Sequence, residues 1–126
     1  MRKHFPLPPS PPPASGELRL VGGSGPHEGR VEVYYSGQWG TVCDDLWDAR
    51  EAKVACRQLG HGQALTVGIA GQQPDYAPQG TTSPVWMGDV KCTGSEHKLI
   101  ECRSTITSST AVHGKDMYVE CSDRPM

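Results

Sequence analysis

Three carboxylates are the residues of this sequence best suited to chemistry, because their types and positions favour binding of a metal ion. Asp44 and Asp45 are neighbours in the chain, and Glu96 lies in the segment CTGSE at positions 92–96. Ca²⁺ prefers several hard carboxylate oxygens, which adjacent aspartates can supply together with a glutamate from another loop. These residues therefore predict a calcium site. The alternative is that Asp44 and Asp45 cap turns, as aspartate side chains often do.

The cysteine beside these aspartates raises the question of catalysis. Cys43 directly precedes Asp44 and Asp45, and their negative charge disfavours the thiolate that a nucleophilic cysteine needs. The sequence also contains no Gly-x-Ser-x-Gly elbow, no phosphate-binding glycine loop and no His-Glu-x-x-His zinc helix. We therefore predict that the chain is not an enzyme.

Length and composition favour one small domain rich in turns. The chain has 126 residues, of which 36% are hydrophobic, with 15 Gly and 11 Pro, so extra cross-links are expected to supplement a limited core. The net charge is only -2, from 12 basic and 14 acidic residues. We therefore expect no nucleic acid as a physiological partner. No apolar run approaches the length of a membrane span, and we expect no membrane insertion by this segment.

The chain divides into a leader, a domain and a short tail. Residues 1–16 are proline-rich and are predicted to be a disordered, semi-rigid linker. Their prolines also prevent the apolar helix of a secretion signal. Residues 17–122 form the predicted domain, and residues 123–126 form the predicted C-terminal tail.

Alternating apolar residues and glycines predict the elements that position the carboxylates. Strands are expected over 17–21, 30–35 and 38–42, and Ser36-Gly37 is expected to turn the second strand into the third. In the second strand, Val31 and Val33 should face the core. A helix should begin at Asp48, which has the capping-box spacing to Glu51, and should stop at Gly60.

The second half of the chain has weaker signals. A long surface loop is predicted over 62–82, because periodicity is low and Gly, Gln and Pro are frequent. An extended segment is predicted over 84–87, a short helix over about 95–101, and a final strand over 117–121.

Several short blocks occur in one order along nearly the whole domain. They are RLVGG (19–23), GRVEV (29–33), WGTVCDD (39–45), WD (47–48), VACRQLG (54–60), CTGSE (92–96) with Leu99 and Cys102, and VEC (119–121). In this order the blocks resemble the scavenger receptor cysteine-rich (SRCR) family, over about residues 17–122. The resemblance implies a small disulfide-stabilised α+β fold, in which a curved antiparallel sheet cradles one main helix and a long loop crosses the other side.

The resemblance also implies two disulfides, Cys56–Cys121 and Cys92–Cys102. The chain has five cysteines, where the smaller SRCR group has six and the larger has eight, so it is closer to the six-cysteine group A. Cys43 is the cysteine left unpaired, because its usual partner would fall near Ala111. Cys43 is then a buried thiol, part of an intermolecular bridge, or a residue whose partner was lost.

Two histidines are similar in position to the extra bridge of the eight-cysteine group. If His27 and His61 replace those cysteines, their side chains could share Zn²⁺ or Cu²⁺. Two ligands do not make a site, however. The alternative is that a bridge was lost and polar surface residues took its place.

The family resemblance implies the same cation site as the residue types. In SRCR domains the matching aspartate pair and glutamate bind cations, here Asp44, Asp45 and Glu96, and the same surface contacts ligands. Ser95 and Gly88 replace residues that many relatives use, which puts a second cation site in doubt. The nearby cations Arg50, Lys91 and Lys98 are expected to add charge for ligand binding.

Two functions follow as hypotheses. The first is an extracellular ligand-recognition module of the scavenger receptor type, which binds polyanionic or protein ligands with the assistance of Ca²⁺. The second is a structural or targeting spacer in a larger secreted or membrane-anchored protein, without intrinsic affinity for a ligand. Stabilisation of the fold by Ca²⁺ would distinguish the two.

Overall fold

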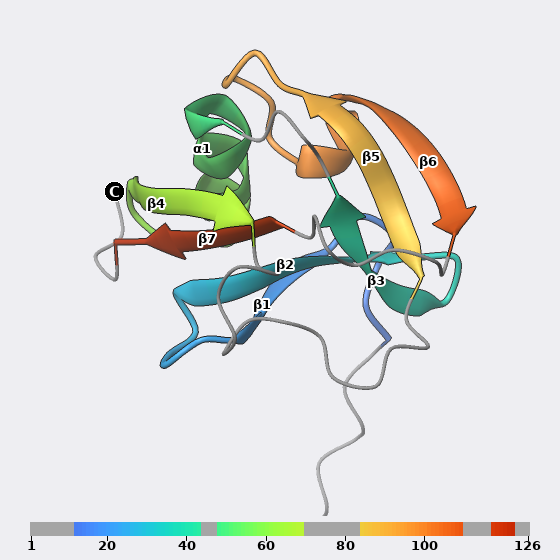
Figure 1. Ribbon diagram of the computed structural model, residues 1–126, viewed down its shortest axis with the longest axis horizontal. Helices are drawn as coiled ribbons and strands as arrows, with labels where there is room; N and C mark the ends of the chain where they lie inside the picture. The colour runs from blue at the N-terminus through green and yellow to red at the C-terminus, as the bar shows by residue number, and fades with distance from the viewer. Residues whose placement is uncertain (1–11, 44–47, 70–83, 110–116, 123–126) are drawn as a thin grey trace, which may run out of the picture.

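The computed structural model describes residues 12–43, 48–69, 84–109 and 117–122. It shows a strongly curled sheet with one α-helix packed against its concave side (Figure 1). The helix α1 spans Ala49–Gln58, and a 3₁₀ turn η2 spans Leu99–Glu101. The strands are β1 (Leu18–Gly22), β2 (Glu28–Tyr35), β3 (Gln38–Cys43), β4 (Ala64–Ile69), β5 (Val85–Lys91), β6 (Arg103–Ser109) and β7 (Met117–Cys121).

The strands form one sheet in the order β4-β7-β2-β3-β5-β6, and β1 pairs with β2 outside this path. All neighbours are antiparallel except β3 and β5, which are parallel. The expectation of an antiparallel sheet is therefore right for five of the six pairings. A parallel pair requires a crossover connection, and the chain between β3 and β5 includes α1 and β4.

The helix begins as its sequence predicts. The side chain of Asp48 caps the first turn and accepts a hydrogen bond from the backbone N–H of Arg50 at 2.8 Å. The carboxylate of Glu51 accepts one from the backbone N–H of Asp48 at 3.3 Å, which completes the capping box. The helix ends at Gln58, with Leu59 as its C-cap, and Gly60 follows with φ +79°, a conformation that favours glycine.

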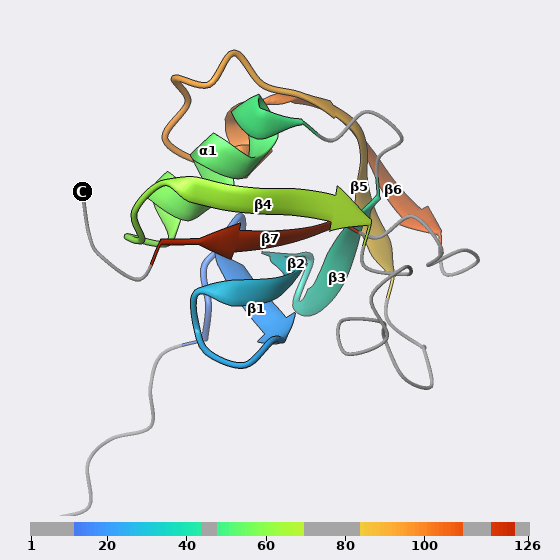
Figure 2. The ribbon, with the colours of Figure 1, turned by 60° about the vertical axis from the view of Figure 1, so that its left-hand side comes forward.

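The core lies between the sheet and α1. Val31 and Val33 of β2 are fully buried, as their alternation predicts. From the helix, Val54 and Cys56 pack into the same cluster. Figure 2 shows α1 beside β4 and β7, which the helix contacts directly. Burial of this apolar surface is the main force that holds the helix on the sheet.

Two disulfides fix the helix and the 92–102 loop. Cys56–Cys121 joins α1 to β7 across 65 residues, with the Cα atoms 5.7 Å apart. Cys92–Cys102 closes the loop between β5 and β6, with the Cα atoms 4.8 Å apart. These are the pairings that the family resemblance implies.

Three features differ from the elements expected from the sequence. The predicted loop over 62–82 is wrong in its first part, because residues 64–69 form β4 and pair with β7. The strand β6 was not expected, since Ile106 is the only apolar residue in its sequence RSTITSS. The short helix expected over 95–101 is limited to the 3₁₀ turn η2 at Leu99–Glu101.

Candidate functional site

Glu96 lies in a tight turn that begins at the Cys92–Cys102 disulfide. One carboxylate oxygen, Oε1, accepts hydrogen bonds from the hydroxyl and backbone N–H of Thr93 at 3.0 and 3.1 Å and from the backbone N–H of Gly94 at 3.1 Å. The other oxygen, Oε2, accepts from the backbone N–H of Thr93 at 3.0 Å. These bonds, led by that from the Thr93 backbone, lower the pKa of Glu96 to about 2. The turn therefore presents a carboxylate that is ionised and fixed in orientation.

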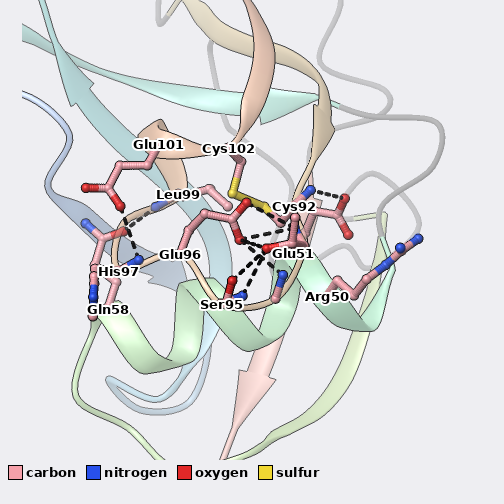
Figure 3. Close-up of a disulfide and its surroundings, with 12 residues drawn as sticks. Arg50, Glu51, Gln58, Cys92, Ser95, Glu96, His97, Leu99, Glu101 and Cys102 are labelled. Carbon is pink, nitrogen blue, oxygen red and sulfur yellow. Dashed lines mark hydrogen bonds between the residues drawn. A yellow bond between two sulfur atoms is a disulfide. The ribbon is translucent and has the colours of Figure 1, made fainter.

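The other two predicted metal ligands, Asp44 and Asp45, lie outside the described residues. Their segment connects Cys43, at the end of β3, to Asp48, the N-cap of α1. The carboxylate of Glu51 accepts a hydrogen bond from the backbone N–H of Asp48 at 3.3 Å. It accepts another from the backbone N–H of Cys92 at 3.2 Å (Figure 3). The side chain of Glu51 therefore links Asp48, which follows the aspartate segment, to Cys92, the first residue of the Glu96 turn.

The position of Glu51 perturbs its protonation. Its side chain is almost fully buried, with 2% of the residue exposed. Burial, followed by the hydrogen bond with the Asp48 side chain, raises the pKa of Glu51 to about 7. The hydrogen bonds that Asp48 makes with Glu51 and Arg50 lower its own pKa well below the usual range. Asp48 therefore carries the charge of this pair, immediately after the aspartate segment.

The chemistry of the donors fits a hard cation and not a thiophilic one. Among the described residues, the one group with three candidate metal-binding atoms within 4.8 Å of each other is Cys92, Glu96 and Cys102. The two sulfurs form a disulfide, so they supply no thiolate. Glu96 is the remaining donor, and carboxylate oxygens suit Ca²⁺. Residues 44 and 45 would have to supply the other oxygens.

The two histidines considered as metal ligands have other neighbours. The Nε2 atom of His61 lies 3.0 Å from the carbonyl oxygen of Pro26, to which it can donate a hydrogen bond. The carbonyl of His27 accepts a hydrogen bond from the backbone N–H of Cys121 at 2.7 Å. Within the described ranges, no group of three candidate metal-binding residues includes either histidine. These contacts join the 26–27 turn to His61, which follows α1, and to β7.

The three predicted ligand-binding cations lie on different elements around the 92–102 loop. Arg50 is on the first turn of α1 and forms an exposed ion pair with Asp48 at 3.0 Å. In Figure 3 its side chain points away from the Glu96 carboxylate. Lys91 ends β5, and Lys98 immediately precedes η2; both are exposed. The structure therefore places all three on the surface but does not bring them into contact.

Cys43 is half-buried at the end of β3 and takes part in neither disulfide. It lies beside Gly88 of β5 in the parallel register. The thiol is therefore partly buried, because the end of β3 lies near the surface of the sheet.

The link that Glu51 makes to the Glu96 turn was not predicted from the sequence. The place of Glu51 in the capping box was visible in the sequence, but its contact with Cys92 depends on a residue 41 positions away. The one feature of the sequence that could have indicated this contact is the position of Glu51 on the buried face of the helix, because a buried carboxylate needs hydrogen-bond partners.

One open depression lies elsewhere on the surface, between the start of α1 and the start of β4. Its lining residues are Ala49, Lys53, Gly62, Gln63 and Ala64, around a volume of about 330 Å³. The cysteines and carboxylates of the Glu96 turn do not line it. The described helices are all too short to cross a lipid bilayer.

The chain is similar in sequence to macrophage scavenger receptors. The macrophage scavenger receptor types I and II of Bos taurus is 45% identical over 109 residues, and that of Mus musculus is 42% identical over 106 residues. These matches cover 86% and 83% of the chain but only 23% and 22% of the relatives. The chain thus spans less than a quarter of the length of these receptors.

Solved structures have the same fold. The third SRCR domain of murine neurotrypsin matches with a TM-score of 0.69 and 41% identity, over 83% of this chain and 94% of that one. The dimeric form of the SRCR domain of mouse MARCO matches with a TM-score of 0.62 and 37% identity, over 82% and 93% of the two chains. The family model of the scavenger receptor cysteine-rich domain matches residues 21–122. With its disulfides and curled α+β fold, the chain belongs to the scavenger receptor cysteine-rich domain family.

Proposed function

We propose that this chain is an extracellular recognition module that binds polyanionic or protein ligands with the help of Ca²⁺ held by Asp44, Asp45 and Glu96. Its place in the SRCR family and its similarity to macrophage scavenger receptors support a non-enzymatic receptor role. Two disulfides suit an oxidising extracellular environment. A module in a longer receptor or secreted protein agrees with the small fraction of each relative that the chain spans.

The observation that carries the calcium proposal is the state of the Glu96 carboxylate. Hydrogen bonds from Thr93 and Gly94 fix this carboxylate through its Oε1 atom. Its Oε2 atom accepts one described hydrogen bond, which leaves room for a cation. Glu51 holds the Glu96 turn near the residue that follows the aspartate segment. Three carboxylates gathered there would repel one another until a divalent ion neutralises them.

The test is thermal unfolding of the full chain with and without millimolar Ca²⁺. A ligand that binds only the folded state raises its melting temperature by mass action. We expect Ca²⁺ to stabilise the wild type, and Asp45→Asn and Glu96→Gln to lose this stabilisation. Without Ca²⁺, Asp45→Asn should be at least as stable as the wild type, because one repelling charge is gone.

The choice of variants follows from the structure. Glu96 also holds the Thr93–Gly94 turn, so Glu96→Gln, which keeps a carbonyl acceptor, is preferred to Glu96→Ala. Glu17→Gln removes an exposed charge outside the proposed site and should respond to Ca²⁺ like the wild type. If Ca²⁺ does not stabilise the wild type, the module is better described as a spacer domain. If Asp45→Ala destabilises the metal-free domain by about 1 kcal/mol or more, Asp45 is a turn-capping residue, because alanine cannot replace the capping oxygen that asparagine keeps.

A further inference from the structure

Two cations face each other across the strands that lead into and out of the 92–102 loop. Lys91 is the last residue of β5 and Arg103 is the first residue of β6, and they are register partners in this antiparallel pair. Each is adjacent in sequence to one cysteine of the Cys92–Cys102 disulfide. The bridge therefore fixes the positions of both cations, and they cannot move apart without distortion of the loop.

Both side chains point to solvent. Cys92 and Cys102 are each 5% exposed and point into the core. Because successive residues of a strand point to opposite faces, the neighbours Lys91 and Arg103 share the outer face, and both are exposed. Thr105, two residues after Arg103, is also exposed and lies opposite Gly88. The outer face thus presents an ammonium group, a guanidinium group and a hydroxyl-bearing residue.

Among the described residues, no acid forms an ion pair with either cation. Three arginines of the described domain do have carboxylate partners, because Arg19 and Arg30 both bond to Glu32 and Arg50 bonds to Asp48. The nearby Asp89 is exposed, with φ 51°, and lies where the β5–β6 register is irregular. Like charges directly opposite each other are unfavourable in a sheet, so a bound anion would relieve this repulsion.

We propose that Lys91 and Arg103 form an oxyanion-binding pair for a sulfate or phosphate group of a polyanionic ligand. The guanidinium can donate two parallel N–H bonds to such a group, and the ammonium can donate a third. This pair adds Arg103 to the ligand-binding residues, where sequence reasoning named Lys91 with Arg50 and Lys98. The inference deepens the proposed ligand recognition and rests on it, but it requires no metal ion.

The test measures binding of the full chain to an immobilised sulfated polysaccharide and, separately, to inorganic polyphosphate, both in EDTA. Lys91→Gln and Arg103→Gln should each weaken binding by about fivefold, the scale of one exposed ion pair. Lys53→Gln removes the same charge from an exposed position on α1 and is the matched control. Preference for one probe identifies the oxyanion as sulfate or phosphate.

A charge reversal separates lost binding from lost folding. Lys91→Glu places opposite charges across β5 and β6, so the melting temperature should stay the same or rise while binding falls below that of Lys91→Gln. Equal binding by Lys91→Gln, Arg103→Gln and Lys53→Gln would overturn the proposal. The outcome is independent of the calcium test, because it is measured without Ca²⁺. Loss of Ca²⁺ stabilisation in Asp45→Asn, with normal binding in EDTA, would implicate the cation site alone.

Discussion

The carboxylate of Glu51 accepts a hydrogen bond from the backbone N–H of Cys92 at 3.2 Å, across 41 residues of chain. The same side chain caps the first turn of α1 through Asp48. A single buried carboxylate thus joins the start of the only described α-helix to the disulfide that closes the 92–102 loop. Perturbation of Glu51 should therefore affect the loop as well as the helix.

Protonation of Glu51 should make the domain more stable as the pH falls from about 7 to 4.5. Its pKa is about 7 in the folded state and 4.5 ordinarily, so the folded state binds the proton first over this range. Glu51→Gln should remove this contribution, which appears as a smaller rise in melting temperature between pH 7 and 4.5 than in the wild type.

Below pH 4.5 the expected slope has the opposite sign. Glu96 has a lowered pKa of about 2, so its contribution is present above 4.5 and is lost as the pH approaches 2. Glu96→Gln should make that acid limb shallower, although Asp48, whose pKa is also lowered, still contributes to it. The slope between pH 7 and 4.5 should stay unchanged. For Glu51, the contrary result is a melting temperature that changes with pH above 4.5 in the same way for the wild type and Glu51→Gln. That result would show that Glu51 is ionised in the folded state over this range.

Truncation should show where the leader begins to contribute to the domain. The backbone N–H of Gly16 donates to the carbonyl of Tyr34 at 2.7 Å, and Gln58 donates from its side chain to the carbonyl of Gly16 at 2.8 Å. Deletion of residues 1–13 should leave the melting temperature unchanged. Deletion of residues 1–17 also removes the bond from Tyr34 to Glu17 and should cost about 1–3 kcal/mol.

The two deletions are compared by calorimetry on otherwise identical chains. A loss of several degrees for the shorter deletion would mean that the proline-rich leader stabilises the domain, contrary to its prediction as a linker.

Intact mass measured after alkylation under denaturing conditions should show one modified thiol, that of Cys43, and two intact bridges. The pairings in the structure leave this one cysteine outside the disulfides. Reduction should then lower stability by about 2–5 kcal/mol, which is typical for small secreted domains. Three or more alkylated thiols before reduction would contradict the extracellular assignment, and a doubled mass without alkylation would indicate an intermolecular bridge.

Local signals in the sequence were sufficient for the helix and for most strands. The capping box at Asp48 and the stop at Gly60 are confirmed, as is the burial of Val31 and Val33. The strands β4 and β6 were not predicted, because their backbones are ordered by pairing with β7 and β5. Leu65, which is 60% exposed, illustrates the lack of a regular buried face in β4.

The candidate site was also predicted only in part from the sequence. Residue types alone suggested Glu96 as a metal ligand, and the structure adds that its own turn holds the carboxylate. The contact between Glu51 and Cys92 and the pairing of Lys91 with Arg103 were not accessible from the sequence, because each depends on the register of distant segments.

The position of β7 has a consequence for biosynthesis. It is the last strand of the described chain, yet it lies between β4 and β2, and its Cys121 is bonded to Cys56 on the helix. Until β7 has emerged from the ribosome, β4 and β2 lack the strand that lies between them. The thiol of Cys56 cannot form its disulfide before Cys121 has been synthesised. The sheet is therefore completed only after residue 121 has emerged, so final folding and oxidation follow synthesis of nearly the entire domain.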